Sequence, residues 1–362
     1  MNERIRAVLA DHFDADIADR AGLTCLGGHA SLRIYWRIRL PDDGHLPYPR
    51  HESTLMAMVF PDDRDPTESA EATDDAPHDG TLPFADVQQL LQALDIAVPD
   101  IDRIDLDRGV LLLEDLGDQR FEDMVLDASS PEDVATLYQQ ALDLLVDFQS
   151  NLVHHPDPPS SIAFERQFQP SLFDWEFEHY LEWGLRERLH MDDDDWERCQ
   201  RQFQPIKRRI VDRLADMPQA LVLRDYQSRN IMHKQNQLVL IDFQDALVGP
   251  FIYDVVALLR DSYIELPHAQ ADALLHYYGD IGRRADLPWC QDPQALRQAF
   301  YLQTVQRKLK DAGRFIYIDR VKDNPDFLPY YDASIGYVDH ALGQLQGFDD
   351  LHQALHTWEP VW

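Results

Sequence analysis

The sequence has very few lysines: five among 362 residues, and none before position 207. Arginine therefore carries nearly all of the positive charge, and the formal net charge is −32. A chain this acidic is not expected to bind nucleic acid or an anionic membrane surface, because both would repel it. Acidic, lysine-poor surfaces suit a salt-rich cytoplasm, and a bias in genomic composition would explain the same counts equally well.

Long apolar runs and paired cysteines are also missing. No stretch approaches the roughly 18 consecutive apolar residues of a membrane-spanning helix, and the first residues lack the apolar region of a secretion signal. The three cysteines, Cys25, Cys199 and Cys290, are far apart and show no metal-binding spacing. We therefore expect a cytoplasmic protein with reduced thiols.

The first third of the chain has the alternation typical of β-strands. Residues 23–40 predict a hairpin around a Gly-Gly turn, residues 53–60 a third strand, and residues 110–113 the last strand of a second hairpin. Residues 61–80 hold eight acids and one arginine without apolar periodicity. That composition is typical of a solvated or disordered insert.

Helices are predicted over the first twenty residues, over 84–96 and from residue 131 onwards, where apolar residues recur at three- and four-residue steps. A β-rich part followed by a helical part is the layout of an α+β, bilobal protein-kinase-like fold. The predicted boundaries are an N-lobe at 1–113 that carries the insert, a hinge at 114–118 and a helical C-lobe at 119–362.

One stretch, LRDYQSRNIMHKQNQLVLIDF, places acids and an amide between two apolar runs, 220–223 and 238–241, that read as short strands. Asp225 then lies just past the first strand, Asn230 in the intervening loop and Asp242 at the end of the second. Phosphoryl transfer needs such a set, with a carboxylate to accept the proton of the attacking hydroxyl and hard oxygen donors for Mg²⁺. The alternative is a loop whose Asp and Asn side chains only cap turns.

Other short motifs have weaker meanings. Gly27 and Gly28, in GGHAS between the first two strands, would let the backbone approach phosphates closely, although an ordinary hairpin turn explains them equally well. The acids of MDDDDWE are typical of a helix start. Most aromatic residues of DWEFEHYLEWGL, which include Trp175, Tyr180 and Trp183, are expected in the core.

Together these segments resemble the aminoglycoside phosphotransferase/choline kinase superfamily, and within it the bacterial anomeric kinases that act on N-acetylmuramate and N-acetylglucosamine in peptidoglycan recycling. The resemblance rests on GGHASLRIYWRI, GVLLLEDLGD, LRDYQSRNIM, LIDFQDALVGPFIYDVVALLRD and LQTVQRKLKDAGRF, which span nearly the whole chain. It implies a kinase that uses ATP and Mg²⁺ to phosphorylate the anomeric hydroxyl of an amino sugar.

The resemblance also implies roles for the matching residues. Asp225 would be the catalytic base, Asn230 and Asp242 would bind Mg²⁺, and the backbone from Glu114 to Leu116 would hold the adenine.

Further nucleotide and substrate contacts are implied in the same way. The glycine pair would cover the phosphates, and Ser31 and Arg33 would lie beside them. The candidate substrate contacts are Glu176, Arg224 and Asp245, and for Asp245 the alternative role is to support the loop.

The sequence departs from the family pattern in two places. Leu223 stands where the family has a histidine, and little chemical loss is expected because that histidine is architectural. The N-lobe lysine that pairs with a helix glutamate is absent, so we expect Arg33 to replace it, since a guanidinium can grip phosphate oxygens in a bidentate manner. The alternative, above all for Arg37 and Arg39, is that these arginines only line the exposed face of a strand.

Two other functions remain open. A kinase for aminoglycosides or choline-like cations would share the global motifs, and an acidic chain would attract such substrates. A non-catalytic nucleotide-binding regulator would explain the missing lysine. It would, however, be expected to have lost at least one of Asp225, Asn230 and Asp242.

Overall fold

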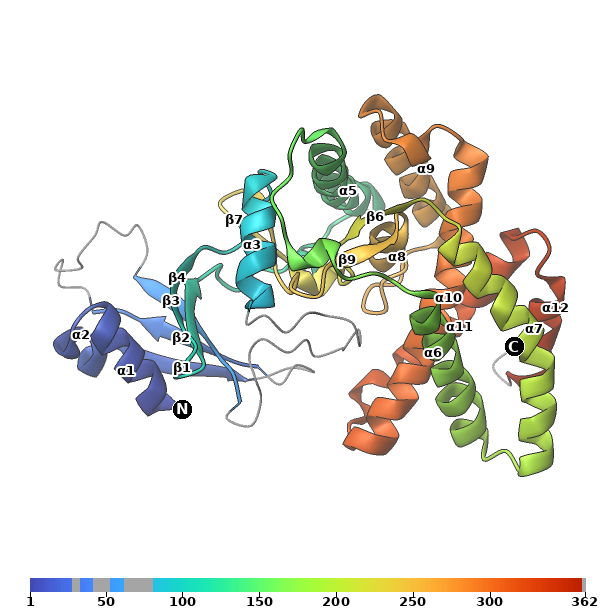
Figure 1. The fold of residues 1–362 in the computed structure, drawn as a ribbon, viewed down its shortest axis with the longest axis horizontal. Coiled ribbons are helices and arrows are strands. Elements are labelled where there is room, and N and C mark those ends of the chain that lie inside the picture. Colours follow the sequence, from blue (N-terminus) through green and yellow to red (C-terminus); the bar gives the residue numbers. More distant parts are fainter. Residues whose placement is uncertain (28–32, 42–52, 62–80, 360–362) are drawn as a thin grey trace.

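The computed structural model describes residues 1–27, 33–41, 53–61 and 81–359. It consists of one β-sheet with helices on both faces and a larger assembly of helices, which lie side by side in Figure 1. This architecture confirms the predicted α+β, kinase-like fold. The acidic insert, apart from Pro61, lies outside the described residues, and the predicted lobe boundaries stay a prediction.

The sheet and its helices are built from β1 (Gly22–Gly27), β2 (Ile34–Arg39), β3 (Thr54–Val59), β4 (Ile101–Asp105), β5 (Val110–Glu114), α1 (Asn2–His12), α2 (Ala15–Arg20) and α3 (Pro83–Ala93). The strand order is β1-β2-β3-β5-β4, and all neighbours are antiparallel. Because side chains alternate along a strand, β3 sends Leu55 and Ala57 into a core with α1 and α2, and Met58 into the core that contains α3. Both faces of the sheet are therefore covered (Figure 1).

The N-terminal segment differs from the single helix predicted over the first twenty residues. It forms two helices, because the chain leaves helical geometry at Phe13 and starts again after Asp14. The Asp14 carboxylate accepts the backbone N–H of Ile17 at 2.7 Å, which is the geometry of a helix N-cap.

The helical part is built from α4 (Phe121–Leu126), α5 (Pro131–His154), α6 (Pro170–His179), the π-helix η2 (Tyr180–Glu187), α7 (Asp193–Ala215), α8 (Tyr253–Leu259), α9 (His268–Arg284), α10 (Pro293–Lys322), α11 (Tyr330–Gln344) and α12 (Asp349–Trp358). Short 3₁₀ turns occupy η1 (Ile162–Phe164), η3 (Ser228–Asn230), η4 (Pro288–Cys290) and η5 (Pro325–Phe327). The longest helix, α10, packs against α6, η2, α8, α9 and α11 and so forms the centre of this part. No helix of the described residues combines the length and apolar character needed to cross a bilayer.

Two small antiparallel strand pairs lie between the sheet and the large helices. They comprise β6 (Gln219–Val222) with β9 (Leu247–Pro250), and β7 (Ile231–Lys234) with β8 (Gln237–Leu240). The predicted strands at 220–223 and 238–241 are β6 and β8. However, β7 lies in the segment interpreted as loop, and β9 was not predicted.

Local backbone geometry explains both missed strands. The β7–β8 hairpin turns at Gln235 and Asn236, both with positive φ (50° and 65°), as in a type I′ turn. The usual Asn-Gly signal of such a turn is absent. In β9, Gly249 and Pro250 are residues that weaken a strand pattern in the sequence.

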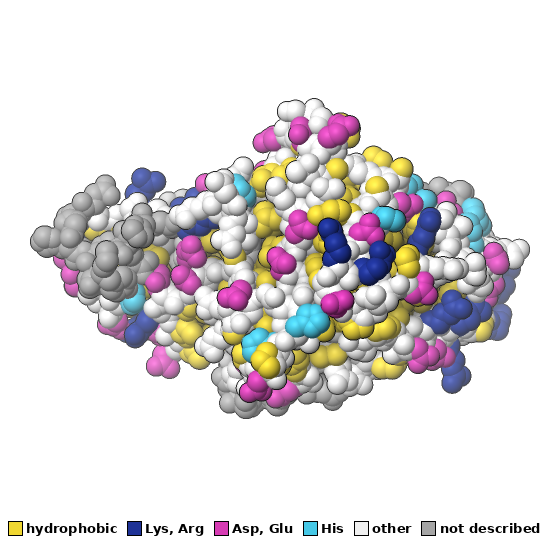
Figure 2. All heavy atoms as spheres, turned by 90° about the horizontal axis from the view of Figure 1, so that it is seen from above, with side chains coloured by type: hydrophobic (Ala, Val, Ile, Leu, Met, Phe, Trp, Pro, Cys, Tyr) yellow, Lys and Arg dark blue, Asp and Glu magenta, His cyan; other side chains and the backbone are white. Residues whose placement is uncertain are grey.

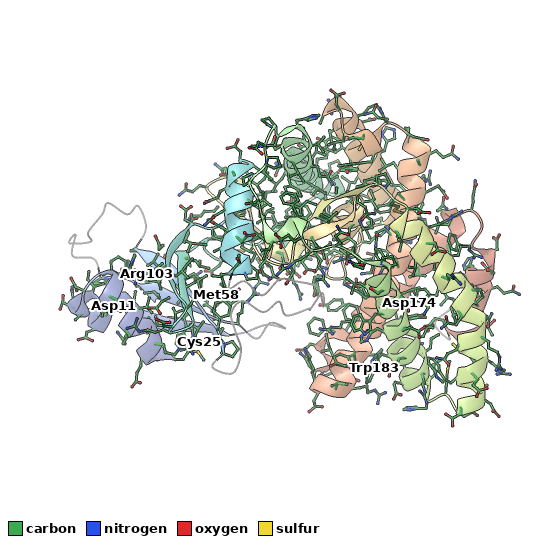
Figure 3. All side chains as sticks on the ribbon, viewed as in Figure 1. Asp11, Cys25, Met58, Arg103, Asp174 and Trp183 are labelled. Atoms are coloured by element: carbon green, nitrogen blue, oxygen red, sulfur yellow. The ribbon has the colours of Figure 1, made fainter. Side chains whose placement is uncertain are left out.

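The aromatic segment on α6 and η2 is only partly in the core. Tyr180 is fully buried and Trp183 is half-buried against the core, as expected for most of these aromatic residues, whereas Trp175 is 55% exposed. Figure 3 shows Trp183 at the lower end of the helical part. On the face in Figure 2, acidic side chains are spread widely, whereas Lys and Arg side chains gather mainly over the helical half.

A glycine sets the contact between α10 and the π-helix. A Cβ atom at Gly313 would lie 2.7 Å from Tyr180 Cα and 3.0 Å from the His179 carbonyl oxygen, both backbone atoms that cannot rotate away. We expect Gly313→Ala to lower the free energy of unfolding by about 1–3 kcal/mol, because overpacking outweighs the better helix propensity of alanine. Urea denaturation would measure this change.

The matched control is Gly336→Ala on α11, where a Cβ atom would meet nothing within 4 Å. There the helix propensity acts alone, and stability should rise by about 0.5–1 kcal/mol. Equal effects at both glycines would contradict a close approach at Gly313.

Candidate active site

Asp225 follows a tight, strained turn of the main chain. Arg224 has a φ of 72°, which is unusual for a residue with a side chain, and the Asp225 N–H donates to the Leu223 carbonyl oxygen at 2.9 Å. A positive φ combined with this hydrogen bond between residues two apart is the geometry of a strained γ-turn. The turn carries the chain out of β6 and leaves the Asp225 side chain 36% exposed.

The buried carboxylate of Asp254, on α8, fixes this turn through two hydrogen bonds. It accepts the backbone N–H groups of Leu223 at 2.7 Å and Arg224 at 2.9 Å. Burial raises the pKa of Asp254 from its ordinary 3.8 to about 7, against the opposing influence of these hydrogen bonds and of Arg307.

The buried guanidinium of Arg307, on α10, also contacts this turn. Its Nη1 donates to the Arg224 carbonyl oxygen at 3.1 Å, and its Nη2 lies 3.8 Å from Asp225 Oδ1. The guanidinium also lies over the Tyr253 ring, 4.7 Å from the centroid. Burial alone would lower the pKa of Arg307, but Tyr253 and the neighbouring carboxylates raise it, so this side chain is cationic.

Asn230 and Asp242 meet Asp225 at one small recess. Its lining residues are Leu223, Asp225, Tyr226, Asn230, Leu240, Ile241, Asp242 and Phe243. Asn230 Nδ2 donates to the Asp225 carbonyl oxygen at 3.0 Å, and the Ile241 N–H donates to the Asn230 carbonyl oxygen at 3.0 Å. These bonds tie the loop to the end of β8 and bring the three predicted residues together.

Gln244 orients the carboxylates that follow β8. Its Nε2 donates to Asp242 Oδ1 at 3.0 Å and to Asp245 Oδ2 at 3.1 Å. The Gln244 carbonyl oxygen in turn accepts Arg166 Nη1 at 2.9 Å. Asp245 therefore lies beside the recess rather than among its lining residues.

The predicted phosphate contacts are described only in part. Gly27 ends β1 with a φ of 85°, a conformation that glycine adopts without strain. Arg33 Nη1 lies 3.8 Å from Asp242 Oδ1, so the guanidinium is on the Asp242 side of the recess. Gly28 and Ser31 lie outside the described residues.

The predicted hinge is held by two cations that the motifs did not single out. Lys234 Nζ donates to Glu114 Oε1 at 2.7 Å and to the Asp115 carbonyl oxygen at 2.8 Å. Arg37 forms an ion pair of 2.7 Å with buried Asp115, so it does more than line an exposed strand face. The Glu114 side chain is thus engaged, and any nucleotide contact at Glu114 or Leu116 falls to the main chain.

The candidate substrate contacts Glu176 and Arg224 lie deeper than predicted. Glu176 is 1% exposed and accepts Gln306 Nε2 at 2.5 Å, which ties α6 to α10. Arg224 is 4% exposed. Both lie outside the residues that line the recess.

Sequence reasoning assigned no role to Asp254, Arg307, Gln244 or Lys234. For the lysines, the sequence did contain a signal. Lysine is so rare in this chain that each of the five could have been singled out as a candidate for a specific contact. Four of the five are buried or half-buried and paired with carboxylates: Lys207, Lys234, Lys308 and Lys310.

The donor set fits a hard divalent cation. The Asn230 amide is fixed by its hydrogen bond to Asp225, so its oxygen is the atom that can serve as a ligand. An amide oxygen and a carboxylate oxygen are donors that Mg²⁺ takes, with water and phosphate completing its shell. The structure thus brings two carboxylates, an amide and a cation together at one recess, a set of groups that phosphoryl transfer can use.

The comparisons with known proteins define the class. The chain belongs to the phosphotransferase enzyme family (APH), whose model matches residues 66–291. It is a small-molecule kinase, and the family implies the use of ATP and a divalent metal ion.

Two relatives carry the name N-acetylmuramate/N-acetylglucosamine kinase. The one from Pseudomonas putida is 30% identical over 268 residues, which cover 74% of this chain and 75% of the relative. The one from Pseudomonas aeruginosa is 30% identical over 279 residues, which cover 77% and 78%.

Solved structures share the fold at low identity. The choline kinase from Cryptosporidium parvum has a TM-score of 0.60 and 11% identity, with 99% of both chains covered. The amicoumacin kinase hAmiN, solved with AMP-PNP and Ca²⁺, has a TM-score of 0.56 and 15% identity, with 92% of this chain and 93% of that chain covered.

The raised pKa of Asp254 gives stability a defined pH dependence. Since the native pKa of about 7 exceeds the unfolded value of 3.8, the stability linked to its proton is complete below about pH 4 and is lost as the pH rises through about 7. Asp254→Asn removes this titration. The wild type's advantage in unfolding free energy over Asp254→Asn should therefore shrink between about pH 5 and about pH 8.

Urea denaturation at several pH values would measure the difference, with Asp286→Asn at an exposed position as the control. A difference that stays constant over this range would mean that Asp254 is ionised throughout.

Proposed function

We propose that this kinase transfers the γ-phosphoryl group of ATP to the anomeric hydroxyl of N-acetylmuramate or N-acetylglucosamine. The observation that carries the proposal is the recess where Asp225, Asn230 and Asp242 meet beside buried Arg307. The names of the relatives support an amino sugar as the acceptor. A cytoplasmic location agrees with this role and is part of the proposal.

Asp225 is the proton acceptor in this mechanism. Its carboxylate orients the anomeric hydroxyl, takes its proton as the oxygen bonds to the γ-phosphorus, and the bond from that phosphorus to the β-phosphate oxygen breaks. The products are a sugar 1-phosphate and ADP. An anomeric hydroxyl is more acidic than an ordinary alcohol, so a single carboxylate suffices as base.

Other residues position the nucleotide. Asn230 and Asp242 would hold Mg²⁺, which would neutralise charge on the phosphates. Arg33, 3.8 Å from Asp242, takes the place of the missing lysine at the phosphates. The main chain of Glu114 to Leu116 holds the adenine, and the glycine pair at Gly27 covers the phosphates.

The charge around the turn at Asp225 is mixed. On α10, Arg307, Lys308 and Lys310 are buried or nearly so, but Arg307 is paired with Asp225, and both lysines are paired with Asp311. Local charge therefore does not separate a cationic acceptor from a sugar, and the names of the relatives are what favour the amino sugar.

The base role of Asp225 is tested by substitution. We expect Asp225→Asn to lower kcat at least about a thousandfold, since the proton acceptor is lost. ATP binding, measured by calorimetry, should change little because Asn230 and Asp242 remain. Asp332→Asn, at an exposed position on α11, is the control, and retained turnover in Asp225→Asn would remove this residue from the base role.

The acceptor class is tested with a coupled ADP-release assay on N-acetylmuramate, N-acetylglucosamine, kanamycin and choline, at low and high salt. Turnover is expected on the sugars, and the product should resist reducing-end reagents because its anomeric oxygen carries the phosphate. Turnover on the cations alone would contradict the proposal. ATP binding without turnover on any acceptor would favour a non-catalytic regulator.

A further inference from the structure

A row of basic side chains lies along one face of α10 and leads away from the recess. Arg307, Lys310 and Arg314 are three and seven residues apart, so they project from the same face on successive turns. Arg307 is 1% exposed, the Lys310 side chain is 18% exposed, and Arg314 is half-buried. This α10 basic stripe therefore runs from the buried catalytic turn towards the surface.

Arg307 is committed to the catalytic turn, through the Arg224 carbonyl and the Tyr253 ring. Lys310 lies one turn further along, about 4.5 Å in the axial direction. It is thus the first cation of the stripe that lies beyond the groups that hold Asp225.

The Lys310 ammonium has capacity for a ligand. It forms an ion pair with Asp311 Oδ1 at 3.5 Å, while Asp311 Oδ2 accepts Lys308 Nζ at 2.9 Å, so two ammonium groups share one carboxylate. Within the described ranges, Lys310 makes no hydrogen bond. Two carboxylates, Asp311 and Glu176, act on this ammonium, but neither accepts a hydrogen bond from it within the described residues, so its N–H donors can serve a ligand anion.

The Tyr253 hydroxyl is a second polar group beside Lys310. Tyr253 is fully buried, and its hydroxyl has no hydrogen-bond partner among the residues that the structure describes. The charged groups that act on this hydroxyl are Arg307, Lys310, Glu176 and Arg224, which places it between the catalytic turn and the stripe. Buried hydroxyls nearly always find a partner.

We propose that Lys310, together with the Tyr253 hydroxyl, recognises the carboxylate of an acidic hexosamine acceptor. This inference rests on the proposed function and names which of its two sugars the site is built for. N-acetylmuramate differs from N-acetylglucosamine by a lactyl ether on O3, two ring carbons from the anomeric centre. Its carboxylate is ionised at neutral pH and would reach a cation one helical turn from Arg307, the residue that lies 3.8 Å from Asp225.

The test combines a variant with a modified substrate. Lys310→Met keeps the length of the side chain and removes its charge, and the methyl ester of N-acetylmuramate removes the charge of the acceptor. We expect Lys310→Met to lower the ratio of kcat/KM for N-acetylmuramate over N-acetylglucosamine about tenfold. The wild type should lose a similar factor on the ester, and the variant should no longer distinguish acid from ester.

Two controls separate charge from structure. Lys310→Arg should restore most of the ratio, because it retains the charge, and Lys322→Met, at the exposed end of α10, should leave the ratio at its wild-type value. If Lys310→Met lowers kcat/KM on both sugars by the same factor, or if it discriminates acid from ester as the wild type does, the inference is wrong while the proposed function stands. If the wild type phosphorylates neither sugar, the proposed function itself fails.

Discussion

The strained turn at Arg224 is the constraint on which the rest of the site depends. A residue with a side chain resists a φ of 72°, and such conformations persist only where surrounding contacts fix them. Here the peptide N–H of Arg224 is held by Asp254 and its carbonyl by Arg307, so that α8 and α10 each contribute one buried polar side chain. The packing of α8 and α10 in the helical part thereby fixes the position of the Asp225 carboxylate.

A second set of ion pairs connects this site to the sheet. Lys234, on the strand that follows the catalytic loop, reaches Glu114 at the end of β5, and Arg37 on β2 reaches Asp115. These pairs are partly shielded from solvent, so salt weakens them less than it weakens pairs on the surface. Lys234 is one of only five lysines in the chain, and it lies where the two parts of the molecule meet.

The sequence predicts the fold class and the three residues of the recess well, because strand patterns and the spacing from Asp225 to Asp242 are local. It does not predict β9, because Gly249 and Pro250 are unfavourable in a strand pattern. This strand is stabilised by its pairing with β6, which the local sequence does not reveal. The contact of Arg307 with the site could not be predicted for another reason. Arg307 lies far along the chain from Asp225, and only the tertiary packing of α10 brings the two together. The burial of Glu176 could not be predicted either, since its partner Gln306 is on a different helix.

The placement of the lysines has a consequence for the chemical reactivity of the protein. Amine-directed reagents attack the uncharged, accessible form of a primary amine, and the ammonium groups of Lys207, Lys234, Lys308 and Lys310 are shielded or paired with carboxylates. Lys322, at the end of α10, is exposed. Apart from the terminal amino group, Lys322 is therefore the main side chain of the folded protein that acylating labels and crosslinkers can modify, so labelling should occur at essentially one lysine.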